Sequence, residues 1–171
     1  MYSRIFVPVD GSDPSNAGLL QAIQLAKNQS AMIRLLHVVD EHVLDLGYCI
    51  GTYPGDVVAS LRDASDKTMR NNVSLVRQFG LEPETISVEN TGDSDTASLI
   101  AEQAKLWGAD LIVMGTHGRV GFKRLTKGSE AESVVRRTRI PVLLVHDESQ
   151  NTPESERAQA LAAPAPLLPQ A

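Results

Sequence analysis

The amino-acid sequence predicts an α/β fold, a doubly wound five-stranded parallel sheet covered by helices on both faces. Five short runs of the chain are apolar throughout rather than at every second residue. Continuous runs of this kind are typical of parallel strands that are buried on both sides. Segments with helical spacing of apolar residues alternate with the runs, and this alternation indicates a sheet with helices on its two faces.

The first two strands are expected at residues 5–9 and 33–39, with a helix between them. Ser15 is the predicted N-cap of that helix. Pro8 is an unusual strand residue because it has no N–H for the ladder, so we expect it at a bulge or at an unpaired position near the strand end. Residues 40–56 contain several glycines and a proline, and we interpret them as a mobile loop.

A long helix is predicted next, with Gly80 as its stop signal, and a short strand is expected at residues 85–88. Asp93 or Ser94 is the predicted N-cap of the following helix. The last two strands are expected at residues 111–114 and 142–145. The helix between those two strands is expected to open at residues 128–129.

Length and composition indicate one globular domain. With 171 residues, 42% of them apolar, the chain can form a substantial core, which we assign to residues 1–147. Residues 148–171 are rich in proline and alanine, and we expect a mostly disordered tail there. The net charge of −5 argues against nonspecific nucleic-acid binding, and Cys49, the single cysteine, excludes an intramolecular disulfide. With no signal-peptide pattern and no apolar run near ~20 residues, we expect a cytoplasmic protein with no nucleic-acid or membrane partner.

Glycines and cations are concentrated in the segment that follows residues 111–114. Residues 115–128 hold four glycines and four cations and contain no acid; the cations are Arg119, Lys123, Arg124 and Lys127. Glycines let backbone N–H groups approach an anion, and the N-terminus of the next helix adds unpaired N–H groups. We interpret this segment as a phosphate cradle, with one or two of the cations near phosphate and the rest in solvent. It contains neither the Walker motif nor the dinucleotide G-x-G-x-x-G pattern.

The spacing of the glycines is more specific than their number. Gly115 and Gly118 are followed, after nine further residues, by Gly128 and Ser129, which is the pattern G-x2-G-x9-G-[S/T]. Together with VPVDGS near the start, LLHVVD in the second strand and PVLLV in the last, this pattern resembles the ATP-binding branch of the universal stress protein family. The resemblance covers residues 1 to about 147.

The resemblance implies the strand order 3-2-1-4-5 and a homodimer. In that order the switch point of the sheet lies between the first and fourth strands, where Asp10 and Gly115 would converge; a flavodoxin-like order 2-1-3-4-5 would separate them. The fifth strand would be an edge of the sheet. Because it is short, apolar and uncharged, it is the predicted dimer contact through Val142, Leu143, Leu144 and Val145.

The resemblance also implies which residues bind the nucleotide, ATP or its diphosphate or monophosphate, with Mg²⁺. Asp10 is placed near the ribose or the metal ion, and Val38 beside the adenine. The full set of expected nucleotide-binding residues is Pro8, Val9, Asp10, Val38, Met114, Gly115, Thr116, His117, Gly118, Arg119, Gly128, Ser129 and Glu130.

Several of these residues have simpler interpretations. Asp10 and Gly11 alone would be read as a turn that ends a strand. For His117 the alternative to ligand binding is a structural role. His37 is interpreted as a core residue rather than a ligand. Glu130 departs from the family pattern, in which this position is often apolar. Its carboxylate suits a helix N-terminus but would repel a triphosphate if it turned inward.

Three functions are consistent with these features. The first is an ATP-binding regulatory module of the stress response, in which the nucleotide acts mainly as a conformational ligand. The second is a slow ATPase or a phosphoryl- or nucleotidyl-transferring enzyme. Such an enzyme needs a positioned general base, and the sequence offers no clear one directed at the loop, which favours the regulatory module. The third is a nucleotide-free dimeric adaptor, in case Glu130 blocks the phosphates.

Overall fold

The computed structural model describes residues 1–40, 55–90, 94–116 and 130–146 of the chain. The strands are β1 (Arg4–Pro8), β2 (Met32–Asp40), β3 (Glu84–Asn90), β4 (Leu111–Thr116) and β5 (Val142–His146). The helices are α1 (Asp13–Gln29), α3 (Gly55–Gln78), α4 (Thr96–Trp107) and α5 (Glu130–Arg137). The expected tail, residues 148–171, and most of the expected loop, residues 41–54, lie outside the described part.

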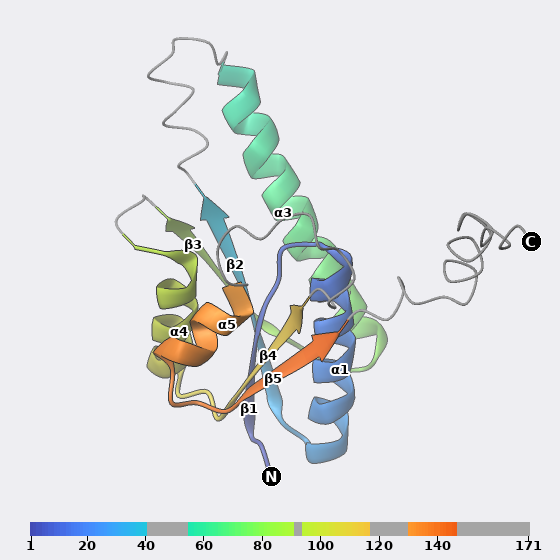
Figure 1. The fold of residues 1–171 in the computed structure, drawn as a ribbon. Helices are drawn as coiled ribbons and strands as arrows, with labels where there is room; N and C mark the ends of the chain where they lie inside the picture. Colours follow the sequence, from blue (N-terminus) through green and yellow to red (C-terminus); the bar gives the residue numbers. More distant parts are fainter. Residues whose placement is uncertain (41–54, 91–93, 117–129, 147–171) are drawn as a thin grey trace, which may run out of the picture.

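The five strands form one sheet in the order β3-β2-β1-β4-β5, and every neighbouring pair is parallel. Helices α1 and α3 lie on one face of this sheet, and α4 and α5 lie on the other (Figure 1). The predicted fold class and strand order are therefore confirmed. From β1 the chain continues to β2 and β3 on one side of the sheet, and from β4 it continues to β5 on the other side. The switch point in strand order therefore lies between β1 and β4.

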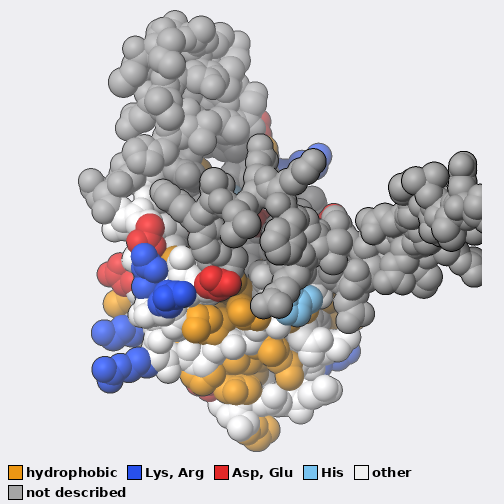
Figure 2. All heavy atoms as spheres, viewed as in Figure 1, with side chains coloured by type: hydrophobic (Ala, Val, Ile, Leu, Met, Phe, Trp, Pro, Cys, Tyr) orange, Lys and Arg blue, Asp and Glu red, His pale blue; other side chains and the backbone are white. Residues whose placement is uncertain are grey.

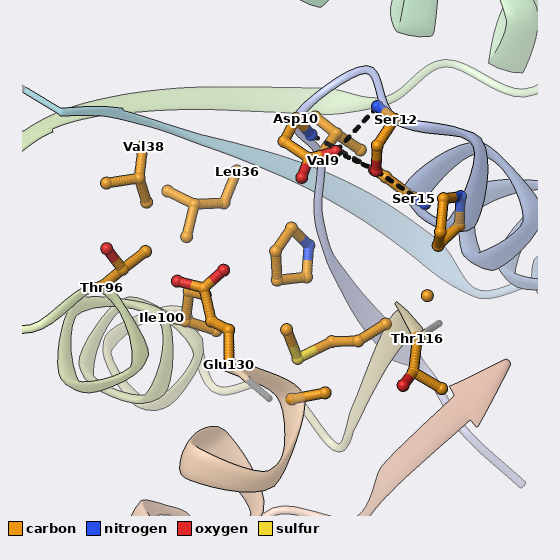
Figure 3. A pocket seen from close by; sticks show the side chains of 15 residues that line it. Val9, Asp10, Ser12, Ser15, Leu36, Val38, Thr96, Ile100, Thr116 and Glu130 are labelled. Carbon is orange, nitrogen blue, oxygen red and sulfur yellow. Dashed lines mark hydrogen bonds between the residues drawn. The ribbon is translucent and has the colours of Figure 1, made fainter. Parts of the chain in front are cut away.

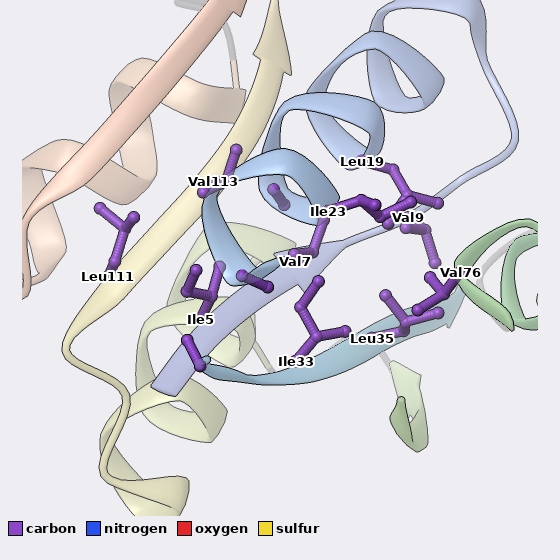
Figure 4. Packing of buried hydrophobic residues seen from close by; sticks show 13 residues of the cluster. Ile5, Val7, Val9, Leu19, Ile23, Ile33, Leu35, Val76, Leu111 and Val113 are labelled. Atoms are coloured by element: carbon purple, nitrogen blue, oxygen red, sulfur yellow. The ribbon is translucent and has the colours of Figure 1, made fainter. Parts of the chain in front are cut away.

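Each strand of the sheet centre is buried on both faces, as its continuous apolar sequence predicts. Ile5 and Val7 of β1 pack with Leu19 and Ile23 of α1 in the core on one face (Figure 4). Phe6, between them in sequence, points to the other face, where it packs with α4 and α5. These side chains are fully buried, and each contributes roughly 1.5–3 kcal/mol to the free energy of unfolding.

Pro8 lies at the end of β1, where it pairs in register with Leu36 of β2 but not with β4. It is the last residue of β1, and the N–H of Val9 donates to the carbonyl oxygen of Leu36 in β2 at 2.8 Å. Successive strand residues turn their N–H groups to opposite sides. The nitrogen of Pro8 therefore faces β4, whose pairing with β1 ends at Phe6, so the missing N–H removes no ladder hydrogen bond.

The first helix begins earlier than its sequence pattern predicts. Its N-cap is Ser12, whose hydroxyl accepts a hydrogen bond from the N–H of Ser15 at 3.3 Å. The prediction of Ser15 as the cap was wrong because Pro14 sits in the first turn of the helix. A proline is compatible with that turn, where N–H groups have no partner within the helix.

The cap of α4 also differs from the prediction. Asp95 is the N-cap, and its carboxylate accepts a hydrogen bond from the N–H of Ser98 at 2.9 Å. Ser94 precedes the cap and Asp93 lies outside the described residues. The side chain of an N-cap accepts from the N–H of the residue two or three positions later. The residue directly before the first helical turn is therefore the one that caps the helix.

In the part of the chain that the structure describes, no helix has the length and apolar character needed to cross a membrane.

Candidate functional site

A pocket of about 450 Å³ opens at the carboxyl ends of β1, β2 and β4. This volume falls within the usual range of small-molecule sites. Its walls come from the strand ends, the β1–α1 turn and the first turns of α4 and α5 (Figure 3). The lining residues are Pro8, Val9, Asp10, Ser12, Pro14, Ser15, Leu36, Val38, Thr96, Ile100, Met114, Gly115, Thr116, Glu130 and Ala131.

The β1–α1 turn is held by hydrogen bonds among three polar residues. Oδ1 of Asp10 accepts from the N–H of Ser12 at 2.9 Å and from its hydroxyl at 2.7 Å. The N–H of Asp10 donates to Oγ of Ser15 at 3.2 Å. Both hydrogen bonds from Ser12 thus go to Oδ1 of Asp10, and neither goes to Oδ2.

Val9, directly before this turn, is anchored to β2 at both of its backbone groups. Its N–H donates to the carbonyl oxygen of Leu36, and its own carbonyl oxygen lies 2.7 Å from Nδ1 of His37. A carbonyl oxygen can only accept, so Nδ1 of His37 carries the proton. The half-buried His37 therefore has a structural role, since it fixes the end of β1 where Asp10 begins.

The first turn of α1 lies in backbone contact with the end of β4. A Cβ atom on Gly115 would lie 1.7 Å from the carbonyl oxygen of Pro14, a distance at which no side chain fits. Gly115 is thus required by packing whether or not it touches a ligand. The contact brings the Asp10–Ser15 turn beside Met114 and Thr116 at the pocket.

Helices α4 and α5 are joined next to the pocket by an ion pair. Nη2 of Arg137 lies 2.9 Å from Oδ2 of Asp95, and Nε of Arg137 donates to the hydroxyl of Ser98 at 3.0 Å. The backbone N–H of Ser98, with a further contribution from Arg137, holds the pKa of Asp95 below that of an ordinary aspartate. Thr96, which lines the pocket, follows Asp95 directly. The Asp95–Arg137 ion pair therefore connects α5 to the first turn of α4 at the pocket.

The two ends of the pocket differ in character. Asp10, Ser12 and Ser15 lie together at one end (Figure 3). At the other end the apolar side chains of Leu36 and Val38 come from β2, and Ile100 lies across from them together with Thr96 and Glu130. Such a combination of apolar side chains and a few polar groups is typical of sites for ligands that are apolar at one end and polar at the other.

The comparison with known protein families decides the family of this chain. Residues 1–146 match the sequence model of the universal stress protein family. The chain belongs to the universal stress protein family. A universal stress protein of Methanocaldococcus jannaschii is 31% identical over 146 residues, which cover 85% of this chain and 82% of that protein. The family predicted from the glycine spacing is confirmed.

Solved structures of universal stress proteins share the fold. A family member from Burkholderia pseudomallei has a TM-score of 0.64 at 28% identity, covering 84% of this chain and 96% of that one. A universal stress protein of Archaeoglobus fulgidus in complex with dAMP matches with a TM-score of 0.58 at 21% identity, over 84% and 97% of the two chains. A universal stress protein in complex with cAMP matches with a TM-score of 0.55 at 21% identity, covering 85% of this chain and 98% of that one.

The structure brings together the described residues among those expected to bind nucleotide. They come from β1, the β1–α1 turn, β2, β4 and α5, and all line this pocket: Pro8, Val9, Asp10, Val38, Met114, Gly115, Thr116 and Glu130. Their contact with a nucleotide stays a prediction. The other expected residues lie outside the described part of this universal stress protein: His117, Gly118, Arg119, Gly128 and Ser129.

Several lining residues were missed in the sequence. They are Ser12, Pro14, Ser15, Leu36, Thr96, Ile100 and Ala131. Ser12 carries a local signal, since Asp-Gly-Ser is a turn sequence in which the side chains of Asp and Ser bond to nearby backbone. Thr96 and Ile100 carry none, because only the packing of α4 against the sheet places them above the ends of β1 and β2.

Proposed function

We propose that this universal stress protein binds an adenine nucleotide, ATP or its diphosphate or monophosphate, in the pocket at the switch point of the sheet. The observation that carries the proposal is the position of the pocket between Asp10 and Gly115, where the G-x2-G-x9-G-S segment begins. Ligands of open parallel sheets bind at this place. The volume of about 450 Å³ is adequate for a nucleoside and its first phosphate.

The solved relatives support this proposal. Two structures with the same fold contain dAMP and cAMP, which are both adenine nucleotides. The glycine segment of this chain adds the donors that an anion needs, since glycines expose backbone N–H groups and a helix N-terminus carries a partial positive charge. Asp10 is suited to bind a ribose hydroxyl or a nucleotide-bound Mg²⁺ through Oδ2.

We further propose that the nucleotide acts mainly as a conformational ligand in a stress response. Fast phosphoryl transfer requires metal ligands, cations on the transferred phosphate and a positioned base. Among the described lining residues, the ionisable side chains are those of Asp10 and Glu130, and none is a Lys, Arg or His. Asp10 is the candidate metal ligand, and one of its oxygens is already engaged by Ser12.

Calorimetric titration of the nucleotide-stripped full chain with ATP, ADP and AMP, with and without Mg²⁺, tests the proposal. We expect binding at or below about millimolar concentration and stabilisation against heat of roughly 2.7 kcal/mol at a hundredfold excess over the dissociation constant. Gly118→Val should abolish binding, because its side chain would occupy phosphate space. Gly80→Val, after the C-terminus of α3, is the control that should lower stability but keep affinity.

Failure of all three nucleotides to bind at millimolar concentration would contradict the proposal and favour the nucleotide-free adaptor. Release of phosphate from ATP at a rate above about 1 s⁻¹, the lower end of ordinary enzymes, would contradict the ligand role and favour the enzymatic alternative. Loss of that release in Asp10→Asn would then identify the residue on which the reaction depends.

A further inference from the structure

Helix α3 lies against the β1–α1 turn directly after Asp10. A Cβ atom on Gly11 would lie 3.0 Å from Cγ2 of Thr68 in α3 and 3.5 Å from its Oγ1. The methyl group of Thr68 therefore fills the space that a side chain at Gly11 would need. Gly11 stands between Asp10 and Ser12, which both line the pocket, so this contact joins α3 to the pocket wall.

Thr68 lies where α3 leaves the core of the protein. The described apolar residues of α3 that pack in the core all follow Thr68 in the chain: Met69, Val73, Leu75 and Val76. Directly before Thr68, Asp66 and Lys67 are exposed. Figure 1 shows the first turns of α3 extending beyond the carboxyl end of β2. The contact with Gly11 therefore supports α3 at the base of its protruding part.

The hydroxyl group of Thr68 makes the same place a soft point of the helix. It donates to the carbonyl oxygen of Ala64, one turn earlier, at 3.0 Å. Such a bond competes with the helix's own N–H for that carbonyl, and it slightly destabilises and often bends the helix. The order of the part before Thr68 thus depends on what Thr68 rests on.

The β1–α1 turn is a support that a ligand can stiffen. Asp10 and Gly11 are exposed, and the side chain of Asp10 is bonded within the turn, to Ser12. An exposed turn held by local bonds opens at a small cost in free energy. A ligand bonded to the carboxylate of Asp10 would hold the turn in one conformation, and with it the surface on which Thr68 rests.

We propose that the order of α3 depends on the occupancy of the pocket. A nucleotide bonded to Asp10 fixes the β1–α1 turn, Gly11 then supports Thr68, and the part of α3 before Thr68 becomes more rigid. This inference rests on the proposed nucleotide function and deepens it, since it names the element through which a conformational ligand acts. By linkage, a partner that binds the rigid form of α3 raises nucleotide affinity by the factor by which nucleotide raises its own.

Hydrogen–deuterium exchange of the nucleotide-stripped full chain, with and without saturating AMP, tests the inference. Amides in the protruding part exchange by local opening, which added global stability does not slow. In the unsubstituted protein AMP should slow exchange at residues 55–67 by at least about fivefold, the lower end of the usual coupling between two sites. Calorimetric titration of the same samples shows independently whether AMP is bound.

Thr68→Ser and Thr68→Val are the matched variants. Serine keeps the hydroxyl that donates to Ala64 but lacks the methyl group beside Gly11, whereas valine keeps a methyl group there and lacks the hydroxyl. Thr68→Ser should still bind AMP but lose the slowing of exchange at residues 55–67. Thr68→Val should retain it, which separates the contact with Gly11 from the hydrogen bond within α3.

Three results would overturn the inference. Unchanged exchange at residues 55–67 in unsubstituted protein that binds AMP would contradict the coupling and leave nucleotide binding intact. Equal slowing in Thr68→Ser and Thr68→Val would show that the contact with Gly11 does not carry the coupling. Absence of AMP binding in the calorimeter would contradict the proposed nucleotide function, and the role of α3 with it.

Discussion

A Cβ atom on Gly18 would lie 2.6 Å from the backbone nitrogen of Gly115, so α1 and β4 are in direct backbone contact. On the other side of the contact, the carbonyl oxygen of Pro14 occupies the place of a Gly115 side chain. This pair of glycines connects the helix that follows Asp10 to the strand end that precedes the glycine loop. It is therefore the packing contact on which the geometry of the switch point depends.

Gly115→Ala is expected to destabilise the protein, because its methyl group must displace the backbone of α1. Forcing extra carbon into packed structure usually costs about 1–3 kcal/mol, and backbone atoms yield less than side chains. Gly18→Ala should act in the same direction. The free energy of unfolding, measured in urea, checks both changes, and nucleotide affinity should fall as the β1–α1 turn shifts.

Gly80→Ala separates this packing effect from backbone strain. Gly80 has a φ of +80°, and no atom lies within 4 Å of the position that a Cβ atom would take, so alanine there meets strain but no neighbour. We expect a loss of about 1–2 kcal/mol from the left-handed conformation, without loss of nucleotide affinity. Equal affinities of Gly115→Ala and Gly80→Ala for AMP would contradict a role of the glycine contact in the site.

His37→Leu should weaken the anchoring of Val9. The substitution leaves the carbonyl oxygen of Val9 without the donor that lies 2.7 Å away in the native protein. An acceptor left unpaired in a partly buried place costs about 1–3 kcal/mol. We expect lower stability in urea and weaker nucleotide binding, since Asp10 follows Val9.

His37→Asn is the control for that prediction, because its amide nitrogen can take the place of Nδ1. It should recover part of the stability and affinity that His37→Leu loses. Identical behaviour of the two variants would show that the hydrogen bond to Val9 is not what matters at this position.

The Asp95–Arg137 pair should make stability depend on pH in the acid range. The pKa of Asp95 is lowered in the folded state by the N–H of Ser98 and by Arg137. A group of this kind stabilises the fold fully above the pKa of the unfolded chain, about 4, and the stabilisation is lost as the pH falls toward the lower folded pKa. Asp95→Asn, which keeps a capping side chain but no charge, should therefore be less stable at pH 7 and should converge with the unsubstituted protein as the pH falls below about 4. Parallel pH profiles of the two proteins would contradict this account.

The homodimer through β5 also stays a prediction, and the surface supports it. β5 is an edge of the sheet, and apolar side chains gather on the face that α5 and β5 present (Figure 2). Leu144 and Val135 are 36% and 47% exposed. We expect a dimer in sedimentation at roughly tens of micromolar, a working range for a stable interface. Leu144→Lys should give a monomer, since lysine on an edge strand opposes pairing.

Leu106→Lys is the matched control for the dimer. Leu106 is 71% exposed on α4, so the same substitution is made outside the edge strand. It should leave the dimer intact. A monomeric unsubstituted protein, or dissociation caused equally by both lysines, would contradict the β5 interface.

The arrangement of elements along the chain was predictable because it depends on local patterns. Continuous apolar runs such as residues 5–9 and 111–114 indicate strands buried on both faces, and the structure places β1 and β4 there. The strand order came from the resemblance carried by the glycine spacing, since apolar runs alone do not specify which strands are neighbours. The caps Ser12 and Asp95 were misassigned because several adjacent polar residues could each cap a helix, and only the position of the first turn selects one.

By itself the sequence determined the fold class, the family and the residues at the ends of β1 and β4, because these features are written in short contiguous motifs. Tertiary structure decided which distant residues join them. Thr96 and Ile100 reach the pocket because α4 packs across the ends of the strands, and Glu130 lies there beside Ile100 of α4. The contact of Gly18 with Gly115 likewise depends on how closely α1 approaches β4. Such distances follow from the packing of whole elements, so no pattern within one segment of the chain contains them.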